Sequence, residues 1–207
     1  MEWKWIDCMP AKIKRLKEDS GRIIYLTAGQ SNRLLETAKQ DQSLHIYLFV
    51  VIGLETSMRR MEILSIRLEN INLEKRVLYI PNAKAGPCEQ PLTKSLVEIL
   101  RKHLNPAKDN QIWLFPSRTY PEKHLKCIKI PFRRVVKSAG LDPKKIVPHT
   151  LRHTAITHLV QAGVDLSTAK RISGHKTLSM VQRYSHQNSA HIQAAMDKLE
   201  GRYATAG

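Results

Sequence analysis

Apolar side chains recur at helical spacing along most of this chain. The first clear helix start is Thr27-Ala28-Gly29-Gln30, which has the spacing of a capping box and precedes an apolar face. The segment from Ser43 to Leu54 is largely apolar, so we expect a buried helix, capped by Ser43 and too short to span a membrane. Further helices are predicted over 59–68, 93–104, 128–138, 150–162 and 165–172, and around Ile192, Met196 and Leu199.

A single small antiparallel sheet is predicted among these helices. Two strands, over 71–73 and 77–80, flank the turn-like Glu74-Lys75. A third short strand is expected at Leu92, after a loop from Asn82 to Gln90. The pattern therefore predicts a mostly helical α+β fold, with one small sheet towards its N-terminal side.

The charge of the chain changes this picture by indicating a polyanionic partner. Lys and Arg outnumber Asp and Glu by 34 to 18 over 207 residues, which gives a formal net charge of +16. The basic residues run through the predicted elements, which argues against a ribosomal protein with basic tails. A surface that follows a DNA backbone also fits better than a merely basic or membrane-bound surface. Such binding should weaken steeply with salt.

Cysteines, histidines and carboxylates argue against other kinds of site. Cys8, Cys88 and Cys127 are widely spaced and form no CxxC pair, so neither a disulfide framework nor a zinc site is expected. The histidines lack an HExxH pattern, and no carboxylate cluster suggests a hard metal. We therefore expect chemistry without metal or cofactor. The charged N-terminus does not resemble a signal peptide, which predicts a cytoplasmic protein.

Residues scattered along the chain could together attack a phosphodiester without a metal. A tyrosine phenol can attack phosphorus, arginines can hold phosphate oxygens bidentately, and lysine or histidine can move protons. The candidates are Arg59, Lys84, His149, Arg152, His175 and Tyr184.

Each candidate alone has an ordinary alternative. Arg59 and Glu62, one helical turn apart, could be a surface ion pair, and Lys84 could be a solvated loop lysine. In the second half of the chain, His149 and Arg152 share one helix face, whereas His153 is expected to point elsewhere. His175 follows a predicted helix C-cap at Gly174 and could simply stabilise the end of that helix. Tyr184 could be an ordinary aromatic residue in the core or at its rim.

Taken in order, the motifs resemble the tyrosine recombinase (phage integrase) family. The resemblance rests on TSMRRME around Arg59, a lysine in a strand–turn loop, HTLRH, SGHKTLSMVQRY and a closing YSH, and extends from about Leu26 to His186. It implies the integrase catalytic-domain fold over 27–188, after an interdomain linker over 1–26. Residues 189–207 would form a tail helix that either docks on a neighbouring protomer or packs on its own domain.

The resemblance also implies a role for each candidate. Tyr184 would be the nucleophile that forms a 3′-phosphotyrosyl link, while Arg59 and Arg152 would clamp the non-bridging oxygens. Lys84 would be the general acid for the leaving 5′-oxygen. The other implied roles are an acid/base near the tyrosine hydroxyl for His149, a phosphate hydrogen bond for His175 and support without chemistry for Glu62.

The sequence departs from the family pattern at a few positions. Ser173 replaces the usual leucine before the Gly-His pair, and Val181 replaces a frequent threonine three residues before the tyrosine. Pro87 and Cys88 stand near Lys84, where basic residues are common. The N-terminal DNA-clamping domain usual in the family does not precede residue 26, so we expect an excised catalytic domain rather than a naturally short protein.

These implications predict site-specific DNA recombination by a bacterial or phage-encoded integrase. Double-stranded DNA would be the substrate, four protomers would assemble in the synaptic complex, and accessory DNA-bending proteins are possible partners. Two alternatives stay open, a type IB topoisomerase-like relaxing enzyme and a non-catalytic DNA-binding relative.

Overall fold

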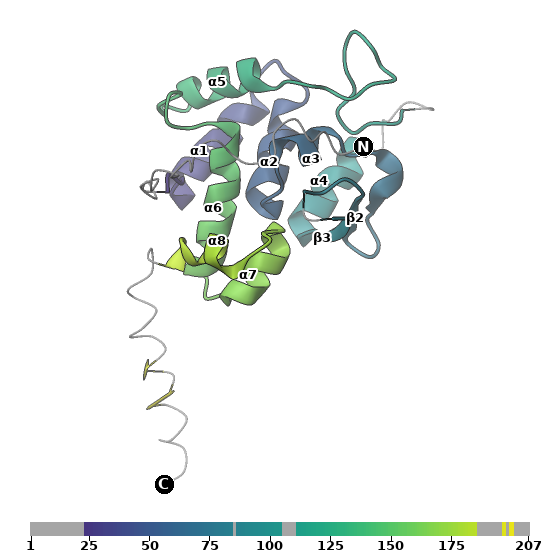
Figure 1. Cartoon of the computed structure of the whole chain (residues 1–207). Helices are drawn as coiled ribbons and strands as arrows, with labels where there is room; N and C mark the ends of the chain where they lie inside the picture. The colour runs from purple at the N-terminus through teal and green to yellow at the C-terminus, as the bar shows by residue number, and fades with distance from the viewer. Residues whose placement is uncertain (1–22, 85, 105–110, 186–195, 198, 201–207) are drawn as a thin grey trace, which may run out of the picture.

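The computed structural model describes residues 23–84, 86–104, 111–185, 196–197 and 199–200. This part of the chain is mostly helical and carries one three-stranded antiparallel sheet, so the predicted fold class is confirmed (Figure 1). Most of the predicted linker, and of the predicted helix around Ile192, lies outside the described residues. Leu26, the last residue of the predicted linker, is fully buried and belongs to the core.

The first two helices are present, but only one has its predicted cap. Helix α1 spans Ala28–Lys39, and Thr27 caps it through a reciprocal capping box with Gln30. Helix α2 spans Ile46–Thr56 and begins after His45, so the predicted cap at Ser43 is wrong. The backbone N–H of Ser43 instead donates to the Asp41 carboxylate at 2.8 Å, which makes a turn before the helix.

The helix predicted over 59–68 is much shorter than expected. Helix α3 spans Arg60–Leu64, and a separate 3₁₀ turn follows at Leu68–Asn70. The intervening backbone pairs with a distant segment, because the Ile66 carbonyl accepts from the N–H of Leu114 at 2.9 Å. This long-range pairing ends the helix, and local periodicity does not reveal it.

The sheet has the order β1-β2-β3, with strands at Ile71–Asn72, Val77–Ile80 and Cys88–Pro91. The third strand begins earlier than predicted, since Cys88 pairs with Ile80, and Leu92 follows the strand. Its inward residue is Gln90, which is 5% exposed. A polar residue at the buried position hides the alternation on which the prediction depended.

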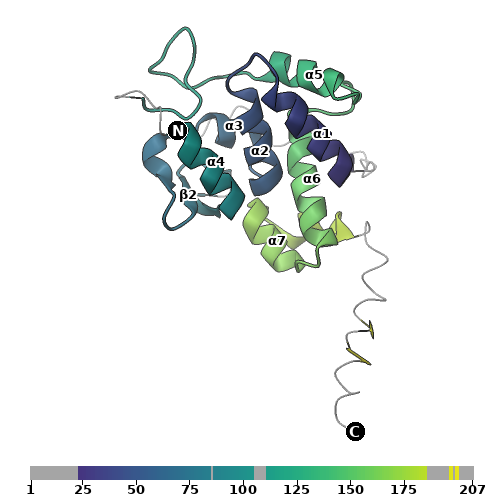
Figure 2. The ribbon, with the colours of Figure 1, turned by 180° about the vertical axis from the view of Figure 1, so that it is seen from behind.

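The later helices agree with the predicted spans to within two residues at each end. They are α4 (Lys94–Leu104), α5 (Lys129–Ser138), α6 (Pro148–Gln161) and α7 (Leu166–Ser173). A short α8 at Leu178–Gln182 was not predicted. Helices α2 and α6 lie side by side in the middle of the domain (Figure 2).

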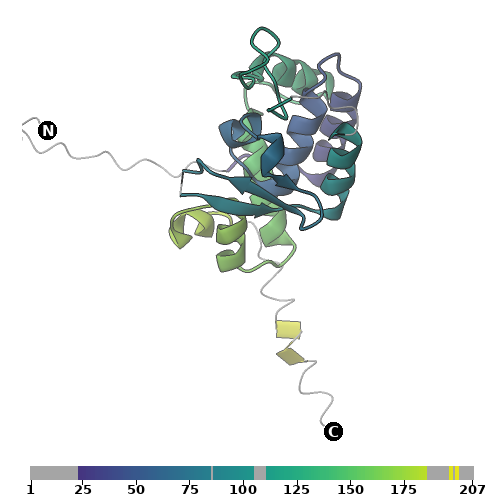
Figure 3. The same cartoon turned by 90° about the vertical axis from the view of Figure 1, so that its right-hand side faces the viewer.

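A second, smaller apolar cluster places α7 and α8 against the end of α6. It contains Ile156, Val160, Ala169, Val181 and Tyr184. Figure 3 shows the sheet lying next to this pair of helices, although they are far apart in the sequence. The fold therefore brings the residues that follow α2, the β2–β3 loop and the α7–α8 region to one side of the molecule. Within the described residues, no helix is long and apolar enough to cross a bilayer.

Candidate functional site

Arg152 is held below the surface by the turn between α2 and α3. Its Nη1 donates to the Ser57 carbonyl at 2.7 Å, and the residue is only 2% exposed. Ser57 follows α2 with φ of 55°, in the left-handed region that residues with a β-carbon rarely adopt. This uncommon backbone conformation directs the carbonyl of Ser57 at the guanidinium.

Arg59 stands at the start of α3, on the same turn. Glu62 accepts from the Arg59 backbone N–H at 2.8 Å and from Nη1 at 2.9 Å. The other terminal nitrogen, Nη2, donates to the Gly174 carbonyl at 3.2 Å. Gly174 ends α7 with φ of 62°, as the predicted C-cap requires. The Arg59–Glu62 pair is thus present, and it also joins the first part of the chain to the end of α7.

His175 is held beside Arg152 by a directional chain of hydrogen bonds. Its Nε2 lies 3.3 Å from Nη2 of Arg152, and because a guanidinium only donates, Nε2 must accept. In the neutral ring the hydrogen is then on Nδ1, which lies 2.7 Å from Oγ of Ser173. The Ser173 hydroxyl donates onward to the Ala169 carbonyl at 2.6 Å. Ser173 therefore anchors the imidazole and fixes its tautomer.

Tyr184 contacts His153 rather than His149. Its hydroxyl lies 2.7 Å from Nδ1 of His153, and the residue is 3% exposed. The prediction that His153 points elsewhere was therefore wrong, because α8 folds back onto α6 and brings Tyr184 to this histidine. His149 is exposed, and its ring packs edge-on against that of His153, with centroids 4.5 Å apart. The Tyr184 and His175 ring centroids are 6.4 Å apart.

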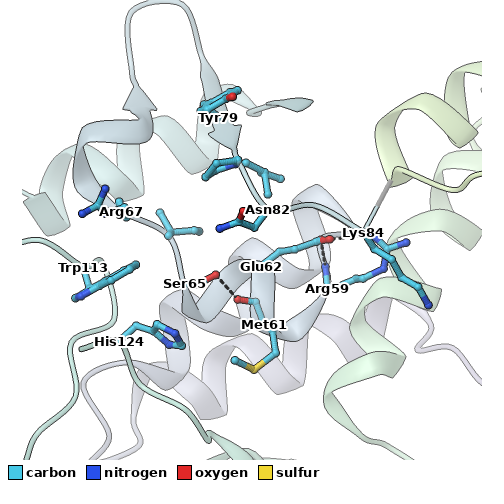
Figure 4. A pocket seen from close by; sticks show the side chains of 13 residues that line it. Arg59, Met61, Glu62, Ser65, Arg67, Tyr79, Asn82, Lys84, Trp113 and His124 are labelled. Atoms are coloured by element: carbon cyan, nitrogen blue, oxygen red, sulfur yellow. Dashed lines mark hydrogen bonds and ion pairs between the residues drawn. The ribbon is translucent and has the colours of Figure 1, made fainter. Parts of the chain in front are cut away.

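Lys84 stands at a hollow beside these residues. The hollow has a volume of about 450 Å³, and Arg59 and Lys84 lie at one end with Trp113 and His124 at the other (Figure 4). Arg67 lies over the ring of Trp113, with its guanidinium carbon 5.4 Å from the ring centroid. Lys84 itself is exposed in the loop after β2. Its side chain can therefore approach a ligand that occupies the end of the hollow near Arg59.

Burial and positive charge set the protonation of the site. Burial, followed by the charge of Arg59, lowers the pKa of Arg152 to about 10, which leaves it charged at pH 7. Burial and the neighbouring cationic groups lower the pKa of both His153 and His175 to about 4. Burial also raises the pKa of the Tyr184 phenol. At neutral pH the site therefore presents two guanidinium cations, neutral imidazoles and a protonated phenol, a set that favours an anionic ligand.

The structure therefore brings most of the predicted residues together. Contacts link Arg59 with Glu62 and with Gly174, and Arg152 with His175. Tyr184 lies next to His175, and it faces the side of α6 that carries His149 and His153. Two residues that the sequence analysis did not assign to the site are His153 and Ser173. The spacing of four residues between His149 and His153 was an available signal, because it places both on one helix face. The contact of Ser173 with His175 depends on the C-cap turn and had no comparable signal.

The sequence matches the Phage integrase family over residues 25–191. It is 25% identical over 203 residues to the tyrosine recombinase XerA of Pyrococcus horikoshii, which covers 96% of this chain and 69% of that protein. The chain spans between 57% and 69% of the length of this recombinase and two others that it matches.

Solved structures show the same fold. The catalytic domain of bacteriophage HP1 integrase has a TM-score of 0.65 at 22% identity, covering 84% of this chain and 94% of that one. The Tn1549 transposon integrase, solved in complex with circular intermediate DNA, has a TM-score of 0.73 at 22% identity. That match covers 89% of this chain and 69% of the integrase chain.

Proposed function

Because the chain belongs to the phage integrase family, we propose that it breaks and rejoins DNA strands at specific sites. The net charge of +16 supports a nucleic-acid partner, and so do the basic side chains of Arg59, Arg67 and Lys84 along the hollow. The observation that carries the proposal is the joining of Arg59 and Arg152 through Gly174 and His175, next to a tyrosine of the same chain.

The proposed chemistry is an in-line attack on phosphorus. The Tyr184 oxygen forms a bond to the scissile phosphorus, and the bond to the 5′-oxygen breaks, which leaves a 3′-phosphotyrosyl link and a free 5′-hydroxyl. Arg59 and Arg152 hold the non-bridging oxygens, where preformed donors stabilise the charge that develops in the transition state. Glu62 holds the Arg59 guanidinium in place without touching the phosphate.

The remaining groups move or position protons. Lys84 protonates the leaving 5′-oxygen from its place at the end of the hollow, and His149 serves as an acid/base group at the exposed start of α6. His175 hydrogen-bonds the phosphate. That bond requires a hydrogen on Nε2. The negative charge of a bound phosphate favours the imidazolium form, in which both ring nitrogens carry a hydrogen.

Assembly on DNA requires more than one chain. We include in the proposal a synaptic complex of four protomers and, where the site demands it, accessory DNA-bending proteins, acting in the cytoplasm of a bacterial host. Leu178 and Met180 on α8 support a protein contact there, because nearly half of the surface of each residue is exposed. Residues 189–207 are the proposed docking element, and they lie mostly outside the described part of the chain.

A covalent-trapping experiment tests the function. The chain is incubated with a library of nicked duplexes of randomised sequence, in which the cleaved end diffuses away and the phosphotyrosyl adduct accumulates. We expect an adduct that survives denaturation, enriched in particular sequences, and absent from Tyr184→Phe. Adducts without sequence preference, together with relaxation of a supercoiled plasmid, would favour the topoisomerase-like alternative. DNA binding without any adduct would overturn the proposed reaction in favour of a non-catalytic binding protein.

A further inference from the structure

The nucleophile candidate already has a proton acceptor in hydrogen-bond contact. Nδ1 of His153 lies 2.7 Å from the Tyr184 hydroxyl, a distance typical of a strong hydrogen bond. The fold holds both residues in place, since His153 belongs to α6 and Tyr184 is 3% exposed in the small apolar cluster. The contact therefore follows from the packing of α6 and α8 and does not depend on two exposed surface side chains.

The direction of this hydrogen bond follows from the charge states of the two groups. Burial keeps the imidazole neutral at pH 7, with its pKa lowered to about 4, and it keeps the phenol protonated. Because the phenol has a hydrogen to give, Nδ1 accepts it and the ring hydrogen is on Nε2. Tyr184 thus points its only transferable proton at a nitrogen lone pair.

We infer that His153 is a catalytic residue that accepts the Tyr184 proton as the phenol attacks phosphorus, and returns it when the strands are rejoined. This inference rests on the proposed function. In cleavage, the bond between the tyrosine oxygen and phosphorus forms, the bond to the 5′-oxygen breaks, and the phenol proton moves to Nδ1 of His153. The 5′-oxygen takes its proton from Lys84, so charges and protons balance, and rejoining reverses each transfer.

The neighbouring charges make the basicity of His153 depend on the substrate. The groups facing it are His149 and Arg152 on α6, His175 before α8, and Arg183 and Tyr184 after it. The positive charges of Arg152 and Arg183 disfavour a protonated His153 in the free protein. A phosphate bound by Arg59 and Arg152 offsets that effect and raises the affinity of His153 for a proton. The phenol is therefore activated only when DNA is in place.

Two variants separate proton transfer from positioning. His153→Asn keeps an oxygen near the position of Nδ1 that can accept a hydrogen bond but is not a useful base, whereas His153→Ala removes both functions. We expect each variant to slow adduct formation on the captured sequence by about 100-fold. Imidazole in the buffer should restore part of the rate in His153→Ala. The matched control is His158→Ala, which removes a half-buried histidine from the same helix away from Tyr184 and should retain the rate.

The pH dependence provides a readout that a structural role would not change. In the variants the phenol must ionise without a base, so their rate should rise about tenfold per pH unit between pH 6 and 9. The wild-type rate should vary much less over that range. If His153→Asn reacts as fast as the wild type with the same pH profile, His153 is not the proton acceptor, although the proposed function stands. If the wild type forms no Tyr184-dependent adduct, both proposals fail together.

A DNA-free measurement covers the case in which His153→Ala does not fold. Two-bond proton–nitrogen NMR correlations of the imidazole report which ring nitrogen carries hydrogen. We expect the hydrogen on Nε2 of His153 and a change at Nδ1 in Tyr184→Phe. A hydrogen on Nδ1 at pH 7 would overturn the inference, because that nitrogen could not then accept the phenol proton.

Discussion

Gly53 of α2 and Leu151 of α6 approach each other so closely that a β-carbon on Gly53 would lie 2.8 Å from Cδ1 of Leu151. Leu151 is 1% exposed, so its side chain has little space in which to move away. The close approach sets the spacing between α2 and α6, and with it the reach of Arg152 towards the Ser57 carbonyl. Helix packing and the arginine pair of the site are therefore coupled through one glycine.

We expect Gly53→Ala to destabilise the protein because the added carbon forces the two helices apart. Overpacking in a filled core typically costs about 1–3 kcal/mol, which outweighs the better helix propensity of alanine. Urea denaturation followed by circular dichroism measures the change. The control is Gly29→Ala in α1, where nothing lies within 4 Å of the added carbon, and which should be neutral or slightly stabilising. Equal stability of the two variants would contradict the role given to the Gly53–Leu151 contact.

Loss of the Ser173 hydroxyl should disturb His175 before it disturbs the fold. In Ser173→Ala the Nδ1 hydrogen of His175 loses its acceptor, which costs on the order of 1 kcal/mol of stability. The tautomer is then no longer fixed, and adduct formation should fall by roughly tenfold. The nitrogen NMR spectrum of His175 checks the tautomer directly. The exposed Ser179→Ala is the control, and an unchanged His175 spectrum in Ser173→Ala would show that another group fixes the ring.

A sulfur leaving group isolates the proposed role of Lys84. We expect Lys84→Ala to slow cleavage of ordinary DNA by about 100-fold, because no group protonates the departing 5′-oxygen. With sulfur in place of that oxygen the variant should react at nearly the wild-type rate, since a thiolate leaves without a proton. Lys137→Ala, on α5, serves as the control. A Lys84→Ala defect that persists on the sulfur substrate would assign Lys84 to phosphate binding instead.

Stability should decrease as the pH falls below neutrality. The folded-state pKa of His153 and of His175 is about 4, below the usual value of 6.5, so in this range the unfolded chain binds more protons than the folded one. The stabilisation that the two neutral histidines contribute is complete only above about pH 6.5. The free energy of unfolding therefore declines as the pH falls from about 6.5 towards 4. Because solvent reaches these rings in part, each contributes about 1–2 kcal/mol. Urea denaturation at several pH values measures this dependence, and the free energy of unfolding should vary less with pH in His153→Asn than in the wild type.

The presence of the helices and the order of the sequence motifs could be predicted from the sequence, because both depend on local features. The capping box at Thr27 and the glycine C-cap at Gly174 are local features, formed by residues within a few positions of each other. The same holds for the Arg59–Glu62 pair, whose partners are one helical turn apart. Such features depend on spacing alone, and the structure reproduces them.

Other features depended on partners that lie far away along the chain. The Ile66 carbonyl pairs with the N–H of Leu114, so α3 is shorter than predicted. The buried Gln90 interrupts the apolar pattern of the third strand, so this strand was predicted too late in the sequence. Neither feature has a signal in the local sequence. His153 was predicted to point elsewhere than the site, and its partner Tyr184, 31 positions away along the chain, reaches it only because α8 packs against α6.

By itself, then, the sequence determined the fold class, the family and the groups available for chemistry, because helical spacing, capping and residue type are local properties. Only the tertiary structure decided which histidine meets Tyr184, and that Ser57 and Ser173 orient Arg152 and His175. These contacts span up to 95 positions or depend on the direction of a tight turn. Hydrogen bonds are formed or lost over less than an ångström, and only the packing of α2, α6, α7 and α8 fixes positions that finely.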